Sequence, residues 1–208
     1  MEHPILMRIR RESFVPLAWF APKDMGDIRF VILVGNVGPD MFLRFARSGV
    51  ETLDGWTRQV VGPMAEDLDA EVAYPFDLPA LPFLTWARRG KAGHTSPLGF
   101  NIHPTYGLWH AYRAALLFPV EFDLPPLSAG VHPCEACAKK PCLTACPVEA
   151  FDGSTYNVEV CGNHLKSVVG STCFESGCLA RRACPVGQAF QYSKPQAQFH
   201  MRAFRALR

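Results

Sequence analysis

The stretch HPCEACAKKPCLTACPVEAF, residues 132–151, decides how the last third of this 208-residue chain folds. Its final seven letters, ACPVEAF, return almost unchanged as ACPVGQAF at 183–190. All eight cysteines of the chain lie at or after the start of this stretch, at positions 134, 137, 142, 146, 161, 173, 178 and 184. In a protein of the reducing cytosol, such a block of thiols favours metal ligation over disulfides.

Composition and charge limit the remaining possibilities. The chain is 49% hydrophobic and 19% charged, which suits one ordinary core and a small second module. A net charge of +2 gives no reason to expect a nucleic-acid partner. The start, MEHPILMRIRRESF, interrupts any apolar signal core with charge, so we expect a cytoplasmic protein. The apolar run 114–120 is too short to span a bilayer, which needs about 20 residues.

The composition shifts at FPVEFDLPPLSAGVHP, residues 118–133, where four prolines precede the cysteine block. We therefore predict one domain over 1–129 and another over 130–208. In the first domain, the pattern predicts a buried strand over 28–35, a turn, and a helix in MFLRFARSG. Helical spacing over 53–69 includes Pro63, which should break or kink the helix. A strand in EVAY and a short helix around FLTWARRG follow.

The cysteine spacing is typical of iron-sulfur proteins. A four-iron cluster takes three thiolates from one loop and a fourth from elsewhere, and in two-cluster ferredoxins the cysteine before proline serves the other cluster. This logic predicts two [4Fe-4S] clusters. Their expected ligands are Cys134, Cys137, Cys142 and Cys184 for the first, and Cys146, Cys161, Cys173 and Cys178 for the second. The prolines should start short helices, PVEAF and PVGQAF, that pack between the two sites.

Two alternatives stay open at the cysteines. Eight thiols can also form two four-thiolate zinc sites, although zinc usually takes paired C-x2-C knuckles and only Cys134 and Cys137 form one. The x11 spacing before Cys173 leaves His164 as an alternative ligand to Cys161. Basic residues flank the thiols and either steer an acidic electron donor or are simply solvated; they are Lys139, Lys140, Arg181 and Arg182.

The segment PLGFNIHPTYGLWHAYRAALLFPVEFDLPPL, 97–127, resembles the core of the cobalamin-processing chaperones of the methylmalonic aciduria type C family. FVILVGNVGPDMFLRFARSG, 30–49, is similar to an earlier strand and helix of that family. Joined to a two-cluster block, the plan also resembles epoxyqueuosine reductase. The resemblance implies an α+β chain, with a truncated nitroreductase-like sheet before a ferredoxin-like dicluster domain. It makes YGLWHAYRAALLF a strand, where local propensity left helix and strand open.

The same resemblance implies a bound cobalamin that is reduced through the clusters. It places Arg113 as a contact to a thiol cosubstrate, His103, Tyr106 and Trp109 near the cofactor, and Asp77 as a proton-donating acid. Each has a plainer interpretation from the residues alone. Arg113 suits an ion pair, Tyr106 and Trp109 suit the core, and His103 and Asp77 suit turns.

These observations predict an iron-sulfur oxidoreductase that passes electrons to a cofactor on the sheet. The expected donor is a low-potential ferredoxin, flavodoxin or flavin reductase, and a complete cobalamin pocket would require a homodimer. The alternative is a non-catalytic electron carrier whose first domain docks a partner enzyme.

Overall fold

The computed structural model describes residues 2–128 and 130–206, and the chain forms two compact units. Unit 1 holds residues up to Ala92 together with the segment from His110 to the end of the first predicted domain. Unit 2 holds Gly93–Trp109 and Gly130–Arg208. The predicted division after residue 129 is one boundary of these units. The structure differs in adding 93–109 to the second unit.

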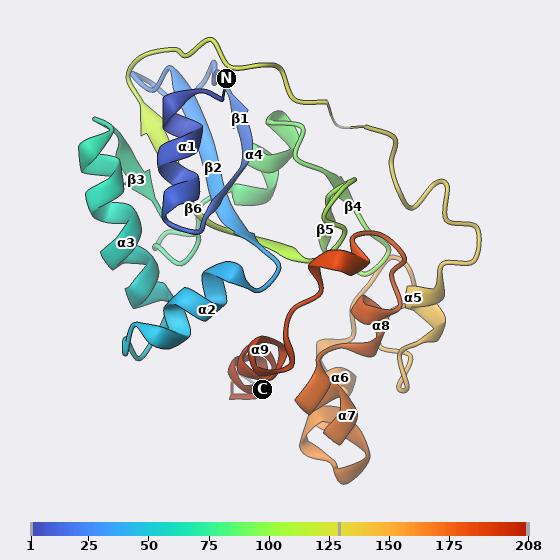
Figure 1. The fold of residues 1–208 in the computed structure, drawn as a ribbon. Helices are drawn as coiled ribbons and strands as arrows, with labels where there is room; N and C mark the ends of the chain where they lie inside the picture. The colour runs from blue at the N-terminus through green and yellow to red at the C-terminus, as the bar shows by residue number, and fades with distance from the viewer. Residues whose placement is uncertain (1, 129, 207–208) are drawn as a thin grey trace. The chain divides into compact units, whose positions relative to one another are not determined.

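Unit 1 is built on a four-stranded antiparallel sheet with the order β1-β2-β6-β3 (Figure 1). The strands are β1 Val15–Phe20, β2 Phe30–Val37, β6 His110–Phe118 and β3 Glu71–Ala73. β2 and β6 pair along their whole length, from Phe30 opposite Phe118 to Val37 opposite His110. The ambiguous segment YGLWHAYRAALLF therefore contains a strand, because β6 lies in the middle of the sheet and takes ladder bonds from both neighbours.

Helices cover both faces of this sheet. α1 Pro4–Arg11 lies on one side and α4 Phe83–Arg89 on the other (Figure 1). Val31 and Leu33 form one core cluster with Trp86 of α4. Ile32 and Val34 alternate with them along β2 and are also fully buried. Burial on both faces of the sheet explains why residues 30–35 form a continuous apolar run.

Two further helices complete unit 1. α2 Asp40–Arg47 follows β2, and α3 Leu53–Asp67 begins at an N-cap where the Thr52 side chain accepts a hydrogen bond from the Gly55 amide. The predicted break at Pro63 is wrong, since α3 continues through it as one helix. Its buried residues Val61, Met64 and Ala65 flank the proline, so packing offsets the backbone hydrogen bond that proline cannot donate.

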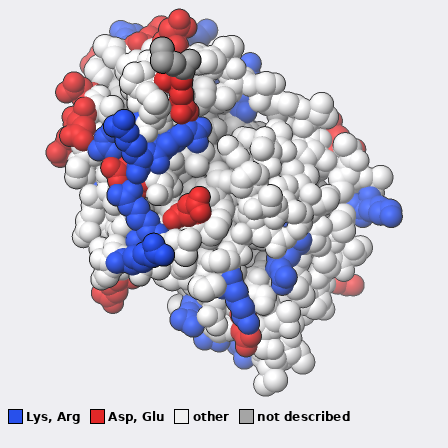
Figure 2. Space-filling view, viewed as in Figure 1, with Lys and Arg blue, Asp and Glu red and all other residues white. Residues whose placement is uncertain are grey.

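The basic side chains of α1 and α2 form ion pairs with nearby acidic side chains. Arg8 pairs with Glu12 at 2.8 Å and with Asp67 at 2.9 Å, and Arg44 also pairs with Glu12. Figure 2 shows this mixture of basic and acidic side chains on the face that carries α1. Such a mixture produces a weaker local field than a surface of one sign.

Unit 2 consists of short helices and one small hairpin. The hairpin pairs β4 His94–Thr95 with β5 Asn101–Ile102. The helices are α5 Pro141–Thr144, α6 Val158–Lys166, α7 Ser171–Ser176, α8 Leu179–Arg182 and α9 Lys194–Ala206, with 3-10 turns η1 Val168–Gly170 and η2 Gln188–Phe190. A ferredoxin-like fold is not evident in the described part of this unit. Within the described ranges, no helix is both long and apolar enough to cross a bilayer.

The two cysteine-proline stretches do not both form helices. PVEAF makes turns that end in a bridge between Phe151 and Tyr156, so the helix predicted there is wrong. PVGQAF ends in the 3-10 turn η2. Ala150 and Phe151 are nevertheless buried in one cluster with Cys142, Cys146 and Cys184, as expected for residues that keep water from the thiols.

Candidate metal centre

All eight cysteines are free thiols in unit 2, and short helices fix most of them. Cys142 lies on α5, Cys161 on α6 and Cys173 on α7. Cys178 and Cys184 flank the four-residue helix α8. Each helix is too short to be stable alone, so packing in the shared cluster determines where the thiols lie.

One set of four thiols combines the first motif with the last cysteine. The pKa of the Cys134 thiol is raised to about 11, mainly by burial and also by the neighbouring thiols of Cys184, Cys142 and Cys137. The pKa of Cys142 is raised in the same way, first by burial and then by Cys184 and Cys137. Electrostatic coupling of this kind requires short distances. The thiol of Cys184 therefore acts electrostatically on the first motif, whereas the sharing of one cluster by these four thiols remains a prediction.

The other set combines the later cysteines with Cys146. Burial raises the pKa of Cys173, and the charges of Cys146 and Cys161 add to it. The pKa of Cys178 is raised to about 11, mainly by burial and also by Cys161 and Cys173, despite opposing backbone hydrogen bonds. The thiol of Cys161 thus acts on those of Cys173 and Cys178, and the thiol of Cys146 acts on Cys173. The crossed division of ligands between two clusters, with Cys161 or His164 as one ligand, remains a prediction.

Several backbone N–H groups point at the sulfurs. The Ala150 amide donates to the sulfur of Cys146 at 3.3 Å. Backbone hydrogen bonds from Leu179 and Val186 lower the pKa values of Cys173 and Cys184, opposing the larger effect of burial. Such donors stabilise a thiolate, whereas burial and like charges disfavour one until a cation is bound. This donor set fits a group of iron ions, which would hold the thiols deprotonated.

The thiols within each set are not packed around one point. In the described ranges, no three His, Cys, Asp or Glu side chains lie close enough together to hold a single metal ion. A four-iron cluster spaces its thiolates more widely than one ion does, because each thiolate binds a different iron.

The predicted cofactor residues are divided between the units. In unit 2, the Nδ1 atom of His103 accepts hydrogen bonds from the amides of Thr105, at 3.0 Å, and Tyr106, at 3.3 Å. The rings of His103 and Tyr106 stack at 4.3 Å. Trp109 is 3% exposed. These are the contacts of a turn histidine and a core tryptophan.

In unit 1, Arg113 lies on β6 and its Nε donates to the Oδ1 atom of Asn36 at 2.9 Å. Asn36 is fully buried, and its neutral amide is one partner of this arginine; the predicted ion pair or anion contact of Arg113 remains a prediction.

Asp77 in unit 1 has the contacts of a turn aspartate. Its Oδ2 accepts from the Tyr74 amide at 2.9 Å, and its Oδ1 pairs with Arg58. Burial tends to raise the pKa of Asp77, but the Tyr74 and Arg58 hydrogen bonds outweigh it and lower the pKa overall. A carboxyl with a lowered pKa is ionised at neutral pH, so its role as a proton donor remains a prediction.

Sequence reasoning missed two residues of unit 2. Tyr156 stacks on Phe151 at 4.5 Å beside Cys161, and nothing in its turn sequence DGSTYN indicated this place. Arg181 was expected only as surface charge. Its guanidinium instead lies over the rings of Trp109 and Tyr192 and donates to the Leu108 carbonyl. The position of Arg181 in the sequence, between Cys178 and Cys184, was the one signal that could have indicated these contacts.

Solved structures share this fold. The structure of epoxyqueuosine reductase from Streptococcus thermophilus matches with a TM-score of 0.58 and 13% identity, over 91% of this chain and 66% of that one. Selenomethionine-labelled epoxyqueuosine reductase matches with a TM-score of 0.50 and 16% identity, over 84% of this chain and 53% of that one. A C. elegans B12-trafficking protein, CblC, matches with a TM-score of 0.47 and 14% identity, over 96% of this chain and 94% of that one.

The two reductase matches define the class of fold. The chain is a mixed α/β protein with a fold like that of epoxyqueuosine reductase, and it spans about half to two thirds of the length of those reductases. No protein-family model matches the sequence. No curated protein matches it either.

Proposed function

We propose that this protein is an iron-sulfur redox protein that holds two [4Fe-4S] clusters and passes electrons to a cobalamin, or to a substrate through it. The proposal is supported by the electrostatic coupling of the thiols: Cys184 raises the pKa of Cys134, and Cys146 raises the pKa values of Cys161 and Cys173. Two crossing cysteine-proline residues are the pattern of two-cluster ferredoxins. Two separate four-thiolate zinc sites do not require such a crossing.

The protein's own residues would bind and protect the clusters. The eight thiols would hold them, and bound iron would supply one-electron transfer. Amides such as that of Ala150 would donate to the ligating sulfurs and favour the thiolate form. Phe151 and Ala150, both buried among the thiols, would keep water away. A low-potential protein donor, and a second copy of the chain that completes the cobalamin pocket, are parts of the same proposal.

Metal analysis tests the first half. Anaerobically purified protein should contain about eight irons and eight acid-labile sulfides per chain. The preparation should bleach on reduction with dithionite. Stoichiometric zinc in place of iron would contradict the proposal.

Cobalamin titration tests the second half. Added cobalamin should shift its visible spectrum and co-elute with the protein on gel filtration. Arg113→Gln should weaken retention, while Arg29→Gln, at an exposed arginine of the same unit, should not. Equal retention by both variants would contradict a role for Arg113.

A non-catalytic electron carrier is the second candidate, and one observation favours it. Trp109 is buried, and the Nδ1 atom of His103 already accepts two backbone amides, so neither presents its full polar surface to a cofactor. A protein that contains eight irons but neither shifts the cobalamin spectrum nor retains cobalamin would be this carrier.

A further inference from the structure

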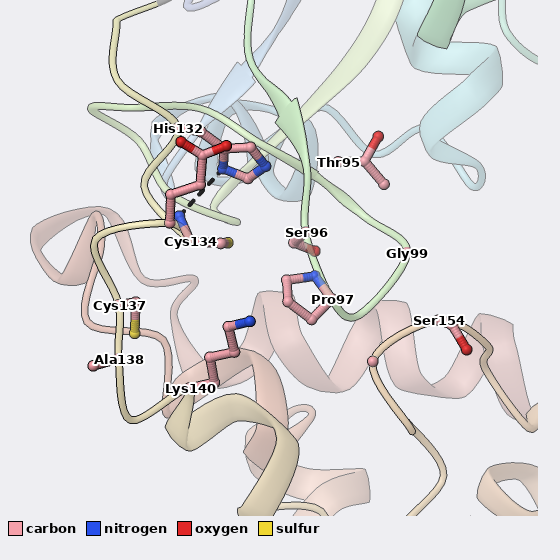
Figure 3. Close-up of a pocket in the computed structure, with 12 residues that line it drawn as sticks. Thr95, Ser96, Pro97, Gly99, His132, Cys134, Cys137, Ala138, Lys140 and Ser154 are labelled. Atoms are coloured by element: carbon pink, nitrogen blue, oxygen red, sulfur yellow. Dashed lines mark hydrogen bonds between the residues drawn. The ribbon is translucent and has the colours of Figure 1, made fainter.

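A pocket of about 600 Å³ opens within unit 2 beside Cys134 and Cys137 (Figure 3). Its volume is within the range of small-molecule sites, about 300–1,000 Å³. The other two thiols of the first set, Cys142 and Cys184, are buried and do not line it. The pocket is therefore bordered by the two partly exposed thiols of this set.

The spacing of the first motif brings a lysine to this pocket. The chain has four residues between Cys137 and Cys142, two more than the shortest ferredoxin spacing. Within this longer loop, Lys140 adopts a left-handed backbone with φ of 38°, just before Pro141 begins α5. In Figure 3 its side chain extends across the pocket toward Pro97. A non-glycine residue at positive φ is uncommon and often accompanies function.

Two further groups on the wall are hydrogen-bond donors. Ser96 is 6% exposed, and its Oγ has no hydrogen-bond partner among the described residues. Its backbone is already used, since its amide donates to Phe100 and its carbonyl accepts from Gly99. His132 accepts the Cys134 amide at Nδ1, at 3.2 Å, so a neutral ring carries its proton on Nε2 as a donor. A buried hydroxyl without a partner is rare in native proteins unless a ligand or water binds it.

We propose that this pocket binds the phosphate or carboxylate group of a small molecule, with Lys140, Ser96 and His132 as its donors. The inference rests on the proposed function in one respect: the ligand would then lie at the edge of the first cluster, against Cys134 and Cys137. Glu135, which also lines the pocket, carries the opposite charge and is exposed. Its removal should therefore strengthen anion binding.

Calorimetry on the anaerobically purified chain tests the proposal with four probes: inorganic phosphate, citrate, flavin mononucleotide and riboflavin. We expect saturable binding of at least one anion and at least tenfold weaker binding of riboflavin, which lacks the phosphate. Lys140→Gln should weaken binding about tenfold, the loss typical of one charged hydrogen bond. Lys139→Gln is the matched control, because this neighbouring lysine is exposed and does not line the pocket.

If flavin mononucleotide binds and phosphate displaces it, the ligand of the pocket is a phosphorylated cofactor. If only phosphate or citrate binds, the ligand is a free anion. In both cases Ser96→Ala should weaken anion binding, and Glu135→Gln should tighten it. The electron paramagnetic resonance signal of the reduced first cluster should change on saturation. Absence of saturable anion binding, or equal losses in Lys140→Gln and Lys139→Gln, would overturn the inference. A preparation without iron would instead refute the proposed function, and its calorimetry would still report on the pocket.

Discussion

The guanidinium carbon of Arg181 lies 4.6 Å from the centre of the Trp109 ring, and it lies 4.4 Å from the Tyr192 ring on another side. The Nε atom donates to the Leu108 carbonyl at 2.9 Å. This arginine thus joins the segment 93–109 to the cysteine-bearing part of unit 2. Leu98, Ile102 and Leu108 of that segment also lie in one core cluster with the thiols.

Replacing Arg181 should therefore destabilise unit 2. Arg181→Lys keeps the charge but loses the planar group that stacks on two rings, so we expect a loss of about 1–3 kcal/mol in the free energy of unfolding. Denaturant titration followed by circular dichroism measures it. Arg182→Gln, at the exposed neighbour, is the control and should change stability by less than about 0.5 kcal/mol. Equal effects of the two variants would show that the stacking contributes nothing.

Removal of single thiols should reveal the crossing. Cys146→Ser should damage the cluster held with Cys161, Cys173 and Cys178, and Cys184→Ser should damage the other. Iron analysis should show roughly half the metal retained in each variant. Electron paramagnetic resonance should then show different remaining signals in the two proteins. If both variants retain the same cluster, the proposed division of ligands is incorrect.

The stability of the protein should fall in mild acid because of His103. Burial lowers the pKa of this imidazole from 6.5 to about 4. Between these values the unfolded chain binds a proton that the folded chain does not, so stability is lost as the pH falls from about 6.5 towards 4. The contribution amounts to about 2 kcal/mol between pH 7 and pH 5. His103→Asn keeps an acceptor for the turn but does not titrate, and its unfolding free energy should depend less on pH over this range. An unchanged pH dependence would exclude His103 as the cause.

Asp77 offers a test that separates its turn contact from its ion pair. Asp77→Asn keeps an oxygen for the Tyr74 amide and loses only the charge facing Arg58, a partly exposed pair worth at most about 1 kcal/mol. Asp77→Ala loses both and should cost about 1–2 kcal/mol more. Thermal unfolding of the two variants measures the difference. If Asp77→Asn unfolds as readily as Asp77→Ala, the ion pair, and not the turn contact, accounts for the stability.

Periodicity and propensity together were sufficient to predict β2, β3, α2 and α4. They left helix and strand open for β6, and only the resemblance to known families favoured the strand that the structure has. The repeated cysteine-proline unit also led to the predicted division of the thiols between two clusters, which remains a prediction. The sequence could not predict that α3 continues through Pro63, because the compensation comes from packing on the sheet. Nor could it place 93–109 in unit 2, since the contacts of Arg181 join residues more than seventy positions apart.

The two copies of the cysteine-proline repeat differ at the residue after valine, where the turn of the second copy is crowded. In ACPVEAF the residue after valine is Glu149, with φ of 50°, and in ACPVGQAF it is Gly187, with φ of 72°. Both therefore adopt the left-handed turn. A Cβ on Gly187 would lie 2.3 Å from the Tyr106 carbonyl oxygen, and a Cβ on Gly107 would lie 2.0 Å from the Val186 carbonyl oxygen. The second copy thus needs glycine because the backbone of 106–107 packs directly against it.

Gly187→Ala should consequently cost at least about 2 kcal/mol of stability, since backbone must move as well as adopt a strained φ. It should also reduce the iron retained, because Cys184 lies three residues away. Glu149→Gly is the matched change in the first copy, where glycine relieves the left-handed strain but adds entropy to the unfolded chain, and it should alter stability by less than about 1 kcal/mol. Denaturant titration and iron analysis of both variants measure these effects. Equal tolerance at the two positions would mean that the close approach of the 106–107 turn does not hold Cys184 in place.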